Sequence, residues 1–186
     1  MEEKLMAITL EELAKEVQKL KDIEEIKVLK ARYSDMCDSN HDWTQIKDLF
    51  APDAKWIGDP TQPWGGGNNR EEIEKLFQFY QTQMDGVPGV GVLGHNPMAP
   101  QITVADDGVH ATGKWHMFGA FRMFEGRAET GSKSFLEQGK YEDEYVKIDE
   151  NGNLDPNGKW FISQLSVWDT LCASPQDGWD DKVIQW

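Results

Sequence analysis

The sequence predicts an α+β fold, in which helices cover one face of a curved, mostly antiparallel sheet. Up to Met84, apolar residues recur every three or four positions, which is the period of an amphipathic helix. Beyond Met84 they alternate with polar residues, which is the period of a strand. The pair Asp107-Gly108 is a strong hairpin signal between two such strands. Helices therefore come first and antiparallel strands second.

The helical half begins with a capping box. Thr9 stands three residues before Glu12, and the same spacing recurs at Asp22 and Glu25. Each signal is followed by apolar residues on one helical face: Leu10, Leu13, Val17 and Leu20, then Ile23, Ile26, Leu29, Tyr33, Met36 and Cys37. The pattern predicts a helix that starts at Thr9 and a second helical start at Asp22.

Two further helices and five strands complete the expected elements. Asp42 is expected to cap a short helix, and Asn69 with Glu72 to open a longer one. The strands are expected at residues 54–58, as the two halves of 100–124, at 134–148 and at 159–171. Residues 59–67, with two prolines and three glycines, predict a loop.

The chain is expected to form a single domain over residues 1–186. Residues 1–20 are interpreted as an N-terminal helical extension and 172–186 as a polar C-terminal tail. A sheet curved around helices encloses a cone whose interior is filled by side chains or left as a pocket. Eight tryptophans and eight phenylalanines suffice to line such a pocket with apolar walls, or simply to fill a core.

Charge and composition exclude several classes of partner. The net charge is −14, and lysines and arginines are interleaved with acids, so neither nucleic acid nor an anionic membrane surface is expected to bind. No apolar run approaches the ~20 residues that span a bilayer, and the acidic N-terminus does not resemble a secretory signal. Cys37 and Cys172 are interpreted as reduced thiols, which favours a cytoplasmic protein.

Three residues are candidates for acid–base chemistry. Tyr33 lies on the apolar face of its predicted helix, so its hydroxyl is expected to point inward. Asp38, five residues later, lies at the flank of that face near the helix end, where a carboxylate feels an unfavourable helix dipole. A hydrogen bond to His95 would compensate, fix the ring tautomer and make the free nitrogen a better base. Alternatively, Asp38 only caps the following turn and His95 is a structural histidine before a proline turn.

Several segments resemble the SnoaL-like branch of the nuclear transport factor 2 (NTF2-like) superfamily. They are RYSDMCDSNHDWTQIKDLFAPDAKW, GGNNREEIEKLF, GHNPMAPQITV and ATGKWHM, and the resemblance covers roughly residues 20 to 170. Within that branch the chain is most similar to bile acid 7α-dehydratase and to scytalone dehydratase. The resemblance implies a cone-shaped α+β barrel with a deep pocket, and it assigns catalysis to Tyr33, Asp38 and His95. It also implies a homodimer or homotrimer.

The chain departs from the bile acid enzymes at two positions. Gly119 stands where those enzymes have a second acidic residue, and Trp168 where they have an arginine on the last strand. A bile acid thioester is therefore not the expected substrate. The residues expected to contact a substrate are His116, Trp56, Trp115, Phe118 and Trp168, although His116 and Trp115 are strand neighbours that face opposite ways.

No metal or cofactor is expected from the motifs. The glycines at 65–67 lack the lysine and the spacing of a phosphate loop, and residues 149–160 lack the glycine and glutamate of a calcium loop. The four histidines show no metal-ligand spacing. These observations predict a cofactor-independent lyase, a dehydratase acting on an apolar cyclic hydroxy-carbonyl compound. The alternatives are a polyketide cyclase or isomerase that uses the same base, and a non-catalytic small-molecule binding protein.

Overall fold

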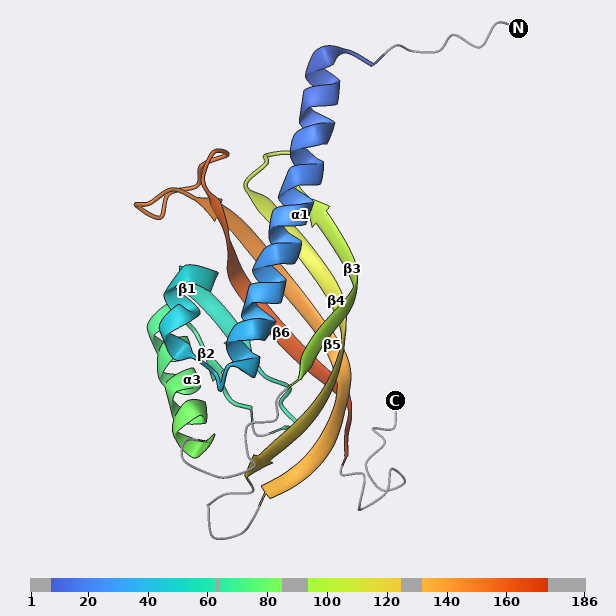
Figure 1. Ribbon diagram of the computed structural model, residues 1–186. Coiled ribbons are helices and arrows are strands. Elements are labelled where there is room, and N and C mark those ends of the chain that lie inside the picture. Colours follow the sequence, from blue (N-terminus) through green and yellow to red (C-terminus); the bar gives the residue numbers. More distant parts are fainter. Residues whose placement is uncertain (1–7, 63, 85–93, 125–131, 174–186) are drawn as a thin grey trace, which may run out of the picture.

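A long helix lies across the concave face of a single curved sheet (Figure 1). The computed structural model describes residues 8–62, 64–84, 94–124 and 132–173. The helices are α1 (Leu10–Asp38), the 3-10 turn η1 (Trp43–Gln45), α2 (Ile46–Leu49) and α3 (Arg70–Met84). The strands are β1 (Phe50–Ile57), β2 (Gly66–Gly67), β3 (His95–Val104), β4 (His110–Phe124), β5 (Ser132–Ile148) and β6 (Lys159–Ala173).

The six strands form one mixed sheet in the order β2-β1-β6-β5-β4-β3. All neighbours pair antiparallel except β1 and β6, which are parallel. The sheet is curved and unclosed, with α3 packed near the β1–β2 end and α1 against β3 and β6. The expected fold, helices on a curved and mostly antiparallel sheet, is confirmed, and the parallel pair is the feature that the sequence did not predict.

The core lies between α1 and the concave face. Alternate residues of β4 are buried from Ala111 to Phe121, so the strand has one inward and one outward face. The buried residues of α1 recur at helical spacing and include Ile26, Leu29, Tyr33 and Met36. They pack against inward residues of β5 and β6 such as Tyr141 and Leu165. This packing brings the C-terminal end of α1 against the start of β3.

The start of α1 agrees with the sequence, but the second helical start at Asp22 is wrong. Thr9 caps the helix, and both halves of its capping box with Glu12 are formed. The helix then continues through Asp22 without interruption. The carboxylate of Asp22 is buried, accepts a hydrogen bond from Trp160 Nε1 at 3.0 Å and pairs with Lys147 Nζ at 2.6 Å. Asp22, whose side chain could have capped a helix, therefore links α1 to the sheet through buried polar contacts.

Candidate active site

An aromatic cavity opens at the end of α1, between that helix, α3 and the sheet. Its volume is about 540 Å³ when the open mouth is included, but the centre of a water molecule can reach only about 60 Å³ of it. The lining is mostly apolar, with a few polar groups: Tyr33, Cys37, His41, Trp56, Trp64, Phe77, Tyr80, His95, Phe121, Phe135, Glu137, Tyr141 and Val167. Apolar walls with few polar groups are typical of small-molecule sites.

Asp38 and His95 meet at one wall of this cavity. Asp38 is the last residue of α1 and His95 the first of β3. The distance from His95 Nδ1 to Asp38 Oδ1 is 2.7 Å, and the backbone N–H of His95 also donates to this carboxylate, at 3.0 Å. An ionised Asp38 accepts the Nδ1 proton, which leaves the lone pair on Nε2. The His95 side chain is 14% exposed and lines the cavity, so this nitrogen is able to act as a base there.

Tyr33 contributes a phenol to the same cavity. Its hydroxyl accepts a hydrogen bond from Trp56 Nε1 at 3.0 Å. The ring packs edge-on against Phe50, Phe77 and Tyr141. Burial raises the pKa of Tyr33 well above its usual value, so the phenol keeps its proton. It is therefore a proton or hydrogen-bond donor and not a base.

A second acid, Glu137, lies in the cavity wall on β5. Burial, together with the charge and hydrogen bond of Asp169 and the charge of Asp59, raises its pKa to about 9. Asp169 accepts a hydrogen bond from Trp64 Nε1 at 2.8 Å, and Asp59 accepts one from the Asp169 backbone N–H at 2.9 Å. At neutral pH Glu137 therefore carries a proton inside an apolar cavity, the state of a general acid.

Glu137 stands directly across from the position where the bile acid enzymes have their second acid. Gly119 pairs with His95 on β3 and with Glu137 on β5, so the three positions form one row across the sheet. A Cβ at Gly119 would lie 2.1 Å from the Phe121 ring, which already fills that space. Glu137 therefore lies one strand away from Gly119, in the same row.

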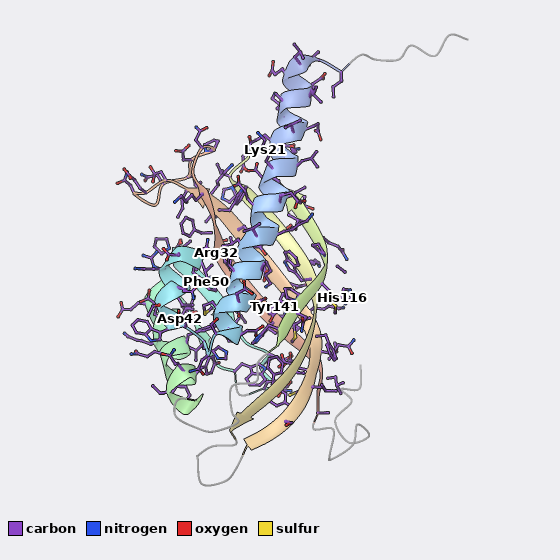
Figure 2. The ribbon with its side chains drawn as sticks, viewed as in Figure 1. Lys21, Arg32, Asp42, Phe50, His116 and Tyr141 are labelled. Carbon is purple, nitrogen blue, oxygen red and sulfur yellow. The ribbon has the colours of Figure 1, made fainter. Side chains whose placement is uncertain are left out.

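The other expected site residues divide between the two faces of the sheet. Trp56 is in the cavity wall. Trp115 faces inward but is buried elsewhere, with its Nε1 donating to Tyr145 Oη at 3.2 Å. Contrary to expectation, His116, Phe118 and Trp168 lie on the outer face, where Phe118 is 39% and Trp168 41% exposed. Figure 2 shows His116 on the outer side of the sheet, whereas Tyr141 is on the side of α1. Strand alternation prevents neighbours such as Trp115 and His116 from sharing a face.

Sequence reasoning missed several residues of the cavity. The clearest are His41 and Glu137, together with the aromatic wall formed by Trp64, Phe77, Tyr80, Phe121 and Phe135. A signal for Glu137 existed: the alternation of β5 places it on the same face as Phe135 and Tyr141, where a carboxyl group is out of place. His41 had no such signal because it follows the helix in an irregular turn.

Comparison with known proteins identifies the family. A family model of SnoaL-like domains matches residues 18–166. None of the curated proteins matches the sequence. In the part of the chain that the structure describes, no helix is long and apolar enough to cross a membrane.

Three solved structures show the same fold at low sequence identity. A candidate scytalone dehydratase from Novosphingobium aromaticivorans superposes with a TM-score of 0.64 at 18% identity, covering 84% of this chain and 89% of that chain. An NTF2-like protein with a cystatin-like fold from the same organism superposes with a TM-score of 0.57 at 21% identity, covering 86% of this chain and 88% of that chain. The hexachlorocyclohexane dehydrochlorinase LinA-type3 from Novosphingobium barchaimii superposes with a TM-score of 0.64 at 14% identity, covering 86% of this chain and 93% of that chain. With a family match over most of its length, the chain belongs to the SnoaL-like domain family.

Proposed function

We propose that this protein is a lyase whose own side chains carry the chemistry, and that it removes water from an apolar cyclic hydroxy-carbonyl compound. The observation that carries the proposal is the 2.7 Å contact between His95 Nδ1 and Asp38 Oδ1 at the wall of an aromatic cavity. The names of the structural neighbours, a candidate scytalone dehydratase and a dehydrochlorinase, support an elimination.

The first step is removal of a proton from the carbon next to the carbonyl group. His95 Nε2 takes this proton, and Asp38 holds the ring in place and stabilises the imidazolium that forms. The electron pair of the broken C–H bond passes into an enolate. The phenol of Tyr33 is a hydrogen-bond donor for the enolate oxygen, because it stays protonated.

The second step is departure of the hydroxyl group. The enolate electron pair forms the new C=C bond as the C–O bond breaks, and the leaving oxygen needs a proton to depart as water. Glu137 supplies it, because it is protonated at neutral pH and lines the same cavity. His95 and Glu137 lie on β3 and β5, two strand spacings of roughly 4.8 Å apart, so an acid and a base face the substrate from separate positions.

The cavity favours a flat, apolar substrate. Aromatic rings form most of its wall, and the space inside is narrow. Steroid-, polyketide- and aromatic-like rings all suit the chemistry of such walls, and the narrow space suits a single ring better than a fused ring system. The occurrence of the protein as a homodimer or homotrimer stays a prediction, as does its cytoplasmic location.

A cyclase or isomerase that uses the same base is the second candidate. Both reactions share the first step with dehydration, because each passes through an enolate. A protonated Glu137 suits either reaction, as a proton donor to a leaving oxygen or as a hydrogen-bond donor to an enolate oxygen. Loss of one water from the product mass separates the two reactions.

Replacing His95 tests the proposal. We expect His95→Ala to fold and to lose at least about 100-fold in kcat/KM, since a general base typically contributes ~10²–10⁴-fold in rate. The measurement is turnover of a panel of cyclic hydroxy-ketones, followed by mass spectrometry. His110→Ala is the matched control, because His110 forms the same kind of pair with Asp107, at 2.8 Å, on the exposed surface. Full turnover by His95→Ala would exclude His95 as the base.

A further inference from the structure

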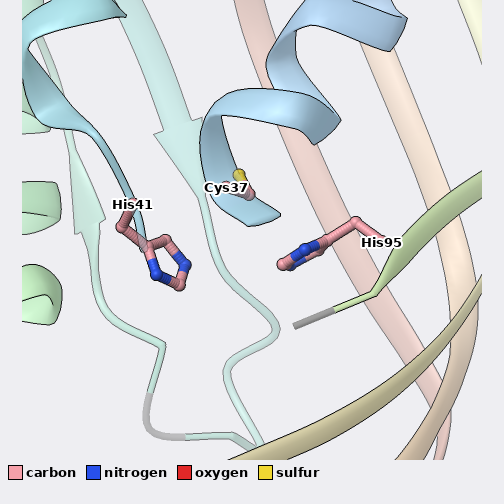
Figure 3. Close-up of side chains that lie close together, drawn as sticks. All are labelled: Cys37, His41 and His95. Carbon is pink, nitrogen blue, oxygen red and sulfur yellow. The ribbon is translucent and has the colours of Figure 1, made fainter. Parts of the chain in front are cut away.

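The end of α1 brings three metal-binding side chains together. The ligand atoms of Cys37, His41 and His95 all lie within 4.8 Å of one another (Figure 3). They come from the last turn of α1, the turn that follows it and the start of β3. All three line the cavity. The dehydration chemistry uses His95 but leaves Cys37 and His41 without a role.

His41 has an unfavourable backbone conformation and an unfavourably buried side chain. Its backbone φ is 53°, in the left-handed region that non-glycine residues rarely adopt. The residue is 7% exposed, and its Nδ1 is buried without a hydrogen-bond partner among the described residues. A buried polar atom with no partner typically costs about 1–3 kcal/mol. A cation at this place would give the buried imidazole a partner.

The surroundings of His95 and Cys37 fit a bound cation. Asp38 holds Nδ1 of His95, which directs Nε2 toward the cavity; a carboxylate behind a histidine is a common support for a metal ligand. Cys37 is buried, and its thiol would release its proton as a cation binds. The resulting thiolate and the Asp38 carboxylate would balance two positive charges.

We propose that Cys37, His41 and His95 form a binding site for a divalent transition-metal ion of the zinc type. One sulfur and two imidazole nitrogens are ligands that Zn²⁺ and Co²⁺ accept and that Mg²⁺ and Ca²⁺ do not. Bond lengths of about 2.0–2.3 Å place tetrahedral ligands roughly 3.3–3.8 Å apart. The most widely separated of the three atoms must therefore close by roughly 1.0–1.5 Å from 4.8 Å, a movement within reach of side-chain rotation. Three protein ligands leave a fourth position for a water molecule or a small ligand.

Metal binding and the proposed dehydration exclude each other. The lone pair on His95 Nε2 cannot hold a metal ion and accept a substrate proton at the same time. A bound ion therefore inhibits the elimination, a consequence that rests on the proposed function. The metal site itself does not rest on it, because binding is measured without any substrate.

Cobalt provides the direct test. Chelator-treated protein is titrated with Co²⁺, and the thiolate-to-cobalt absorption and the visible bands of tetrahedral cobalt are recorded. We expect one equivalent to bind, the bands to disappear when Zn²⁺ is added, and one proton to be released from the thiol. Asp38→Asn is expected to weaken binding by about 10–100-fold, as is usual for a group that supports a metal ligand.

Two ligand variants decide the outcome. Cys37→Ser should abolish the thiolate band, and His41→Asn should lower the affinity at least about 10-fold while keeping the fold, because asparagine tolerates the left-handed region. Cys172→Ser is the control and should bind cobalt like the unaltered protein. The site is excluded if no tetrahedral cobalt spectrum appears. It is also excluded if Cys37→Ser binds cobalt as tightly as the unaltered protein. If Cys37→Ser fails to fold, the same criterion applies to His41→Asn. If cobalt binds but does not inhibit turnover, the metal site stands and His95 is not the base.

Discussion

Glu137 shows how strongly one buried side chain depends on its surroundings. It sits on β5 at a position that alternation turns inward, and Asp169, Asp59 and Tyr141 lie around it. Burial and the two carboxylates raise its pKa from 4.5 to about 9. Nothing in the residues adjacent to Glu137 in sequence produces this change, since Asp59 and Asp169 are brought to it by other elements. The protonated acid of the proposed reaction is thus a product of the fold.

The shifted pKa of Glu137 makes stability depend on pH. The unfolded chain releases the Glu137 proton above about pH 4.5, whereas the folded chain keeps it up to about pH 9. Rising pH therefore favours the unfolded state throughout this window, and the free energy of unfolding falls. Glu137→Gln removes the titration and should reduce this fall between pH 6 and pH 9 by at least about 1.4 kcal/mol, the equivalent of one pKa unit. Urea unfolding at several pH values measures it; equal slopes for both proteins would contradict the raised pKa.

At the scale of elements, α1 is fixed to the sheet by polar contacts as well as apolar ones. Asp22 reaches across to Lys147 on β5 and Trp160 on β6, and all three side chains are buried. A buried ion pair contributes little net stability, but removing one member leaves an uncompensated charge in the interior. This contact fixes the position of α1 along the sheet, and therefore that of Asp38 at its far end.

Removing the charge of Asp22 should destabilise the protein strongly. We expect Asp22→Asn to lower the free energy of unfolding by about 3–5 kcal/mol, because Lys147 remains buried without a counter-charge. Adding Lys147→Met in the same chain should restore part of the loss. Glu24→Ala is the control: its pair with Lys27 is exposed and its removal should leave the unfolding curve unchanged. An unfolding curve for Asp22→Asn that matches the curve of the unaltered protein would show that the Asp22–Lys147 pair does not fix α1 to the sheet.

At the scale of the whole molecule, the two faces of the sheet differ in kind. The concave face, covered by α1 and α3, holds the core and the aromatic cavity. The outer face carries His116, Phe118 and Trp168, all exposed. Because the sheet is unclosed, the two ends of the cavity wall, β3 with His95 and β1 with Trp56, are brought together by curvature and by the helices, not by strand pairing.

An apolar ligand should therefore bind on the concave face and not on the outer face. An apolar cyclic ketone that fills the cavity should quench the fluorescence of Trp56 and Trp64 and stabilise the folded state, by about 2.7 kcal/mol at a concentration 100 times its Kd. Thermal unfolding with and without the ketone measures the stabilisation. Phe135→Ala, which removes part of the cavity wall, should weaken binding, and Phe118→Ala should not. Equal losses in the two variants would place the ligand elsewhere.

The sequence by itself determined the class of fold and most element positions, and the family resemblance favoured the pairing of Asp38 with His95 over a structural role for each. Hydrophobic period and turn residues are local signals, and the family motifs carry the residues around the helix end. Only the tertiary structure decided which aromatics line the cavity, that Asp22 lies in the interior, and that Cys37, His41, His95 and Glu137 share one space. The reason is physical: burial, charge and side-chain convergence depend on segments far apart in the chain, whose packing against one another no local pattern records.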